Sequence, residues 1–100
     1  MRIAVFLVDI NLEYLSPDVT RVFFFDVDEN LIISVGEEVL MLHDIHYLCL
    51  RMLGKKVEVI YIEQISESMK NQVEKIGIIV KPLKEIRNNP FLKALLLSDD

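Results

Sequence analysis

The sequence predicts a single α/β domain over residues 1–100, with a mixed five-stranded sheet. The chain length is that of one domain with one hydrophobic core. Hydrophobic residues make up 52% of the chain, and this fraction excludes an intrinsically disordered protein. In the second half, short β-branched runs alternate with helical patterns, an arrangement typical of parallel strands joined by helices.

The first half of the chain predicts three strands. Residues 3–8 form a continuous apolar run of the kind that is buried on both faces of a sheet. Residues 11–18 contain Pro17 and are expected to form a loop. Residues 21–27 direct apolar side chains to both faces, and turn-type residues connect them to the apolar run 31–35. These second and third strands are therefore expected to form an antiparallel hairpin.

The second half predicts two helices around a strand. Residues 43–53 repeat apolar side chains at helical spacing, and Gly54 is expected to end this helix in the left-handed conformation. The β-branched run 57–62 predicts a strand. The second helix is expected to begin near Ser66 and to end at Gly77, because serine favours helix starts and glycine favours helix ends.

The last elements are a short strand and a helical tail. Residues 78–80 predict the strand, Pro82 ends it, and residues 83–97 predict a helix interrupted at 88–90. The element order is then β-β-β-α-β-α-β-α, with right-handed crossovers between parallel strands, and we expect the strand order 3-2-1-4-5. Handedness places the two connecting helices on one face. On the other face, the aromatic strand 21–27 is expected to leave an apolar patch that favours a homodimer.

Charge and composition narrow the class of partner. The net charge is −5, and residues 1–50 contain nine acidic but only two basic side chains. This balance disfavours nucleic acid, because binding phosphates requires surplus lysine and arginine. No apolar stretch approaches the roughly 20 residues that span a membrane, and the single Cys49 cannot form an internal disulfide. We therefore expect a cytoplasmic protein.

Three stretches carry a resemblance to a known family. Residues 1–5 with Asp9 resemble its opening strand, residues 25–30 its second strand and turn, and residues 57–80 its strand, loop, helix, glycine and strand. Over nearly the whole chain, the sequence resembles the dinitrogenase iron-molybdenum cofactor biosynthesis family of nitrogenase accessory factor-like domains. The resemblance implies a ribonuclease-H-like motif and a binding role. It also implies an iron-sulfur cluster or an iron-molybdenum cofactor precursor as the ligand.

The chain differs from the family pattern in two places. Family members usually carry a Gly-Gly-x-Gly loop after the fourth strand, where this chain has Glu-Gln-Ile-Ser at 63–66. Residues 15–17 stand where the family has a His-Phe-Gly element. These differences favour an alternative function, a ligand-free protein-interaction module that keeps the scaffold and dimerises through the aromatic sheet face.

The candidate ligand-binding residues follow the first and fourth strands. Open α/β sheets bind ligands at the carboxyl ends of their strands, at a topological switch point where the order of the strands reverses. Asp9 follows the first strand, and Glu63, Gln64 and Ser66 follow the fourth. With Asp44 nearby, carboxylates at this edge could instead hold two divalent cations for phosphodiester hydrolysis. A metal-dependent nuclease is therefore a remote alternative.

One helix carries three side chains that can bind metals. His43, His46 and Cys49 follow one another at three-residue intervals. Each such step rotates the side chain around the helix, so the three cannot converge on one ion. His43 and His46 are the candidate metal ligands, and Cys49 is expected to pack in the core. The acidic residues of the hairpin turn, 26–29, lack calcium-loop spacing and predict a solvated turn.

The sequence thus predicts a non-catalytic accessory or carrier protein. The expected ligand is a small metal-containing or anionic molecule, or a partner protein, bound at the shared edge of the first and fourth strands. No nucleic acid or membrane partner is expected. The prediction depends on these two strands being parallel neighbours in the sheet.

Overall fold

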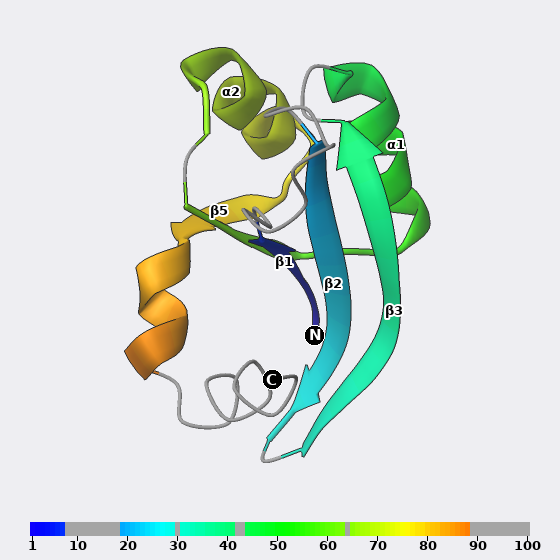
Figure 1. The fold of residues 1–100 in the computed structure, drawn as a ribbon, viewed down its shortest axis with the longest axis vertical. Coiled ribbons are helices and arrows are strands. Elements are labelled where there is room, and N and C mark those ends of the chain that lie inside the picture. Colours follow the sequence, from blue (N-terminus) through cyan, green and yellow to red (C-terminus); the bar gives the residue numbers. More distant parts are fainter. Residues whose placement is uncertain (8–18, 30, 42–43, 64, 89–100) are drawn as a thin grey trace.

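The computed structural model describes residues 1–7, 19–29, 31–41, 44–63 and 65–88 (Figure 1). Along the chain, the elements are β1 (Arg2–Leu7), β2 (Val19–Asp28), β3 (Leu31–Met41), α1 (Ile45–Gly54), β4 (Val59–Ile62), α2 (Glu67–Lys75), β5 (Ile79–Pro82) and the 3-10 helix η1 (Leu83–Asn88). The predicted order of strands and connecting helices is confirmed. The rest of the expected helical tail lies outside the described residues.

The five strands form one mixed sheet in the order β3-β2-β1-β4-β5, as predicted. β1 pairs antiparallel with β2, and β2 pairs antiparallel with β3. β1 and β4 are parallel neighbours, and so are β4 and β5. The order follows from local pairing of the hairpin on one side of β1 and right-handed helical crossovers on the other.

The sheet separates two hydrophobic cores. Side chains of α1 and α2 pack against one face together with alternate residues of β1, β2 and β4, which confirms that both connecting helices lie on the same face (Figure 1). On the opposite face, η1 covers the sheet through Ile86 and Leu83. The buried side chains of the helix-covered face are Ala4, Phe6, Val22, Phe24, Leu40, Leu48, Met52, Val57, Ile60, Ile62, Met69, Val73 and Ile78.

The aromatic strand β2 is more covered than the sequence suggested. Phe24 is fully buried beneath the helices, and Phe25 is 5% exposed on the other face, where it packs in the same core as Ile86. Phe23 is half-buried beside them. The exposed apolar side chains of the hairpin instead belong to β3, where Leu31, Ile33, Val35, Val39 and Met41 are each more than a third exposed.

The strand β3 extends well beyond the predicted run 31–35. Ser34 pairs with Phe25 and Gly36 pairs with Phe24, so Val35 is the extra residue of a β-bulge. Because of the bulge, side chains of odd number lie on the helix-covered face before Val35, and side chains of even number lie on that face after it. A strict apolar period of two therefore does not continue into the second half of β3. Pairing with β2 then continues to Met41.

Helix α1 ends differently from the prediction. Gly54 is its last helical residue, and Lys56, rather than Gly54, has a positive φ of 58°. The Lys56 amide donates to the Leu53 carbonyl at 3.0 Å, and the Val57 amide donates to the Met52 carbonyl at 3.0 Å. This is the Schellman pattern, and burial of Met52 and Val57 in one core places the left-handed residue two positions after the glycine.

Helix α2 ends as predicted. Gly77 has a φ of 89°, and its amide donates to the Glu74 carbonyl at 3.0 Å. The Ile78 amide donates to the Val73 carbonyl at 3.4 Å. Val73 and Ile78 are both buried, so the same Schellman pattern here has glycine at the position where a side chain is strained.

Candidate functional site

The structure confirms the relationship on which the predicted site depends. β1 and β4 are parallel neighbours, and Phe6 of β1 pairs with Ile62 of β4. Both strands therefore end at the same edge of the sheet, which is where α/β folds bind ligands. Glu63 directly follows Ile62 and its side chain is exposed at this edge. Asp9 lies outside the described residues.

The segment after β4 is tied to helix α2. Ile65 is half-buried and packs against the helix-covered core. Ser66 caps α2, and its Oγ accepts a hydrogen bond from the Met69 amide at 3.1 Å. The Ser66 oxygen is thus used by the helix, while its hydroxyl proton can still be donated to a ligand. Gln64 lies outside the described residues.

Two exposed side chains that follow β4 are negatively charged. Glu63 is exposed, and Glu67 is an exposed residue in the first turn of α2. Glu67 interacts favourably with the positive end of the helix dipole and partly offsets the field that would attract an anion. The electrostatics of the described residues here favour a cation or a metal-containing group.

The candidate metal ligands on α1 are only partly described. His46 is exposed on the first turn of the helix, and His43 lies outside the described residues. Cys49 is half-buried against the helix-covered core, as predicted, and burial raises the pKa of its thiol. A protonated thiol is a poor metal ligand. Within the part of the chain that the structure describes, no three histidine, cysteine or acidic side chains gather as a metal site.

Asp44 has a structural role at the start of α1. It is the N-cap of the helix, and its Oδ1 accepts a hydrogen bond from the Tyr47 amide at 3.2 Å. An acidic cap also interacts favourably with the helix dipole. This contact explains why an acid precedes the helix without invoking the catalytic cation site of the nuclease alternative.

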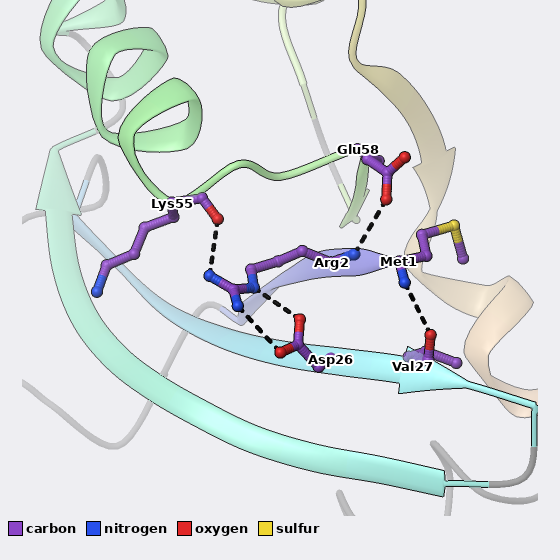
Figure 2. Close-up of polar contacts among 6 residues, drawn as sticks. All are labelled: Met1, Arg2, Asp26, Val27, Lys55 and Glu58. Carbon is purple, nitrogen blue, oxygen red and sulfur yellow. Dashed lines mark hydrogen bonds and ion pairs between the residues drawn. The ribbon is translucent and has the colours of Figure 1, made fainter.

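The acidic turn of the hairpin is divided between two environments. Asp26 faces Arg2 across the β1–β2 pair, and the Arg2 Nε and Nη2 atoms donate to its two oxygens at 2.8 and 3.0 Å (Figure 2). This hydrogen-bonded guanidinium holds the pKa of Asp26 below its ordinary value. Asp28 and Glu29 are exposed, which agrees with the predicted solvated turn.

Sequence reasoning missed the role of Arg2. Its Nη1 also donates to the Lys55 carbonyl at 2.9 Å, and its backbone amide donates to Glu58 Oε2 at 3.2 Å (Figure 2). These contacts join β1, β2 and the connection from α1 to β4. Opposite charges at the outer ends of two pairing strands were the available signal, but it required the cross-strand register of Arg2 with Asp26.

A second charged network joins α1 to β3. Arg51 contacts Glu38 through two hydrogen bonds, and the Lys55 Nζ lies 3.9 Å from Glu38 Oε2. The same Nζ lies 5.6 Å from the centre of the Phe24 ring, within the range of a cation–π contact. Both networks stabilise the scaffold at places other than the edge formed by β1 and β4.

Comparisons with known proteins support the fold. Scans against family models and curated proteins find no match. A Fowlpox virus resolvase, solved with its substrate Holliday junction DNA, is similar over 82% of this chain, with a TM-score of 0.52 and 13% identity. The chain spans 59% of the resolvase chain. The solved structure of PH0822 is similar over 98% of this chain and 91% of its own, with a TM-score of 0.56 and 14% identity.

At these identities, the likeness concerns the fold alone. Together with the mixed sheet in the order 3-2-1-4-5, it establishes the predicted α/β, ribonuclease-H-like fold. The structure also has no helix, within the residues that it describes, with the length and hydropathy needed to cross a membrane.

Proposed function

We propose that this chain is a non-catalytic, cytoplasmic accessory or carrier protein that binds a small metal-containing ligand at the carboxyl edge of β1 and β4. One observation carries the proposal: these strands are parallel neighbours, with Phe6 beside Ile62, so both strands end at one edge of the sheet. The resemblance to the iron-molybdenum cofactor biosynthesis family is consistent with this role. The iron-sulfur cluster that the resemblance implies does not fit the residues at this edge, because such clusters are held by cysteine thiolates and Cys49 packs against the core. A metal ion fits the carboxylates there.

The charges at the edge decide between the ligand classes. Glu63 and Glu67 are exposed there, so an anionic ligand would meet repulsion that a metal ion does not. The Ser66 hydroxyl can donate one hydrogen bond to a ligand atom. Asp9 and Gln64 complete the proposed ligand-binding set, and His43 and His46 are a separate proposed metal pair near the start of α1.

Metal uptake by the folded protein tests this proposal. The chain is reconstituted anaerobically with iron and sulfide, and in parallel titrated with zinc, with absorption spectra and native mass as readouts. Stoichiometric uptake is expected, and Glu63→Gln should weaken it by about tenfold or more, the loss typical of a ligand or its supporting group. Glu74→Gln, on an exposed residue of α2, is the matched control and should leave uptake unchanged.

Two outcomes would redirect the assignment. Folded protein that takes up neither zinc nor iron would favour the alternative, a ligand-free interaction module. Uptake lost in a variant with His43→Ala and His46→Ala but retained in Glu63→Gln would move the site to the start of α1. Either result would remove the edge of β1 and β4 as the binding site.

The resolvase likeness suggests a direct test of the non-catalytic role. The resolvase was solved with Holliday junction DNA, so the chain is incubated with a four-way DNA junction and Mg²⁺. No cleavage is expected, because a net charge of −5 opposes contact with phosphates. Magnesium-dependent cleavage that is lost in Asp9→Asn would establish the nuclease alternative instead.

A further inference from the structure

We propose that the outer edge of β3 pairs antiparallel with β3 of a second copy of this chain, joining the two sheets into one. β3 lies at one border of the sheet, with β2 on its inner side, and no described strand pairs with its outer side (Figure 1). An edge strand presents a row of unpaired amide and carbonyl groups, which another strand satisfies. This inference goes beyond ligand binding and depends only on the sheet.

The two borders of the sheet differ in length and protection. The opposite border, β5, has four residues and ends in Lys81 and Pro82. A short strand with lysine and proline is the usual protection against unwanted pairing. β3 has eleven residues and contains neither lysine nor proline. The sequence therefore protects one border of the sheet and leaves the other open for pairing.

The exposed side chains of β3 favour a strand as the partner. Leu31 and Ile33 are 59% and 50% exposed, and Val39 and Met41 are 57% and 50% exposed. Ile33 pairs with Asp26 and lies on the helix-covered face, whereas Val39 pairs with Arg21 and lies on the opposite face. A helix docked on one face would cover only half of these side chains. A strand added at the edge contacts both sets.

The pattern of β3 matches a second copy of itself. Its most exposed apolar residues lie toward both ends, with its two glutamates near the middle. An antiparallel pairing centred between Val35 and Gly36 places Glu37 opposite Ser34 and Glu38 opposite Ile33 of the second copy. No glutamate then opposes a glutamate, and Leu31 and Val39 lie opposite Leu40 and Ile32 of the second copy. Arg51 pairs with Glu38 within each copy and removes further repulsion.

Helix α1 extends the proposed interface. Arg51 faces β3 through its contact with Glu38, and Tyr47 lies one turn earlier on the same side of the helix with 50% of its surface exposed. Leu50, next to this row, is 66% exposed. A two-fold axis perpendicular to the sheet keeps both copies of α1 on the same face, beside the seam. These residues add apolar area toward the roughly 1,200–2,000 Å² of a stable interface.

The mass of the protein in solution tests the inference, measured by analytical ultracentrifugation without added metal. The native chain is expected at twice its 11.6 kDa mass. A variant with Leu31→Lys and Val39→Lys places a charge on each face of β3, opposite apolar residues of the second copy, and is expected at the monomer mass with an unchanged circular dichroism spectrum. Ile79→Lys is the matched control, because Ile79 is 55% exposed on the opposite border, and it should remain dimeric.

Cross-linking tests the pairing geometry even if the lysine variant fails to fold. In a Cys49→Ser background, Gly36→Cys places two thiols near the two-fold axis, and mild oxidation should yield a covalent dimer. Leu31→Cys should not cross-link, because antiparallel pairing separates its two copies by roughly 30 Å. A native chain at the monomer mass, or cross-linking through Leu31→Cys as readily as through Gly36→Cys, would overturn the inference. Neither result affects the metal-uptake test.

Discussion

Arg51 of α1 and Glu38 of β3 form a two-point contact between a helix and the border strand of the sheet. The Arg51 Nε and Nη2 atoms donate to the two Glu38 oxygens at 2.9 and 2.6 Å. The contact raises the pKa of Arg51, and the two side chains are 36% and 22% exposed. Two parallel hydrogen bonds fix the orientation of the guanidinium more firmly than a single contact. The pair therefore helps to hold α1 beside β3.

A double-mutant cycle measures the strength of this pair. Arg51→Met, Glu38→Gln and the combined variant are compared with the native chain by urea unfolding. We expect a small favourable coupling, because both groups keep partial contact with water. If the change in free energy of unfolding of the combined variant equals the sum of the two single changes, the coupling is zero. The interaction between Arg51 and Glu38 would then contribute nothing to the free energy of unfolding.

The contact between Arg2 and Asp26 predicts a dependence of stability on acid pH. Arg2 lowers the pKa of Asp26 in the folded chain. The stabilisation is therefore fully present above the unfolded-state pKa of about 3.9, and it is lost as the pH falls through the lower folded-state value. In the Asp26→Asn variant, the thermal midpoint of unfolding should therefore fall less steeply as the pH is lowered into the acid range. Asp28→Asn, at an exposed position on the same strand, should leave that fall unchanged.

The cap at Ser66 predicts a graded series of substitutions. Ser66→Ala removes the oxygen that accepts from the Met69 amide and should lower the free energy of unfolding by about 1 kcal/mol. Ser66→Gly should cost only a few tenths of a kcal/mol, because glycine is tolerated at helix starts. Ser68→Ala, two residues later on an exposed position, should change stability little. Equal losses at both serines would contradict the capping role.

Substitutions at the two left-handed residues that follow α1 and α2 should change stability in opposite directions, because one residue is a lysine and the other a glycine. Lys56→Gly should stabilise the chain by about 1 kcal/mol, because Lys56 adopts a left-handed conformation that costs a side chain energy. Gly77→Ala should destabilise it by about the same amount, through backbone strain alone, since a Cβ there meets no atom within 4 Å. Chemical denaturation measures both. Destabilisation by Lys56→Gly would show that this left-handed residue is not strained.

Replacing Gly54 tests whether this residue is helical, as observed, or is the left-handed residue at the end of α1, as the sequence predicted. Gly54 is helical, and a Cβ on it meets no atom within 4 Å. Gly54→Ala should therefore stabilise the chain by about 0.5 kcal/mol, because alanine loses less conformational freedom in a helix. A loss of stability in the same denaturation measurement would restore Gly54 as the left-handed cap.

Most of the fold could be predicted because its signals are local. Apolar periodicity identified the strands and helices, and a serine and a glycine located both ends of α2. For the strand order that was expected and is observed, right-handed crossovers then placed both connecting helices on one face of the sheet. The second half of β3 was missed because the bulge at Val35 changes the face of every later residue.

The adjacency of the two strands that carry the candidate site was predictable, but the chemistry of the site was not. The adjacency of β1 and β4 follows from topology, so the position of Glu63 at a shared edge could be inferred in advance. The use of Ser66 as a helix cap could be inferred too, because its signal lies within four residues. Whether separate side chains converge on one ion could not be inferred, since convergence depends on packing between elements distant in the chain.

The sequence by itself determined the order and type of the elements, because backbone preference and apolar period act over a few residues. The tertiary structure alone decided which charged side chains form ion pairs. Arg2 of β1 contacts Asp26 of the neighbouring strand β2, and Arg51 of α1 contacts Glu38 of β3. It also decided that the left-handed residue after α1 is Lys56, because Met52 and Val57 are both buried in the same core. The physical reason is that burial and charge pairing act through space, over distances that the local pattern does not encode.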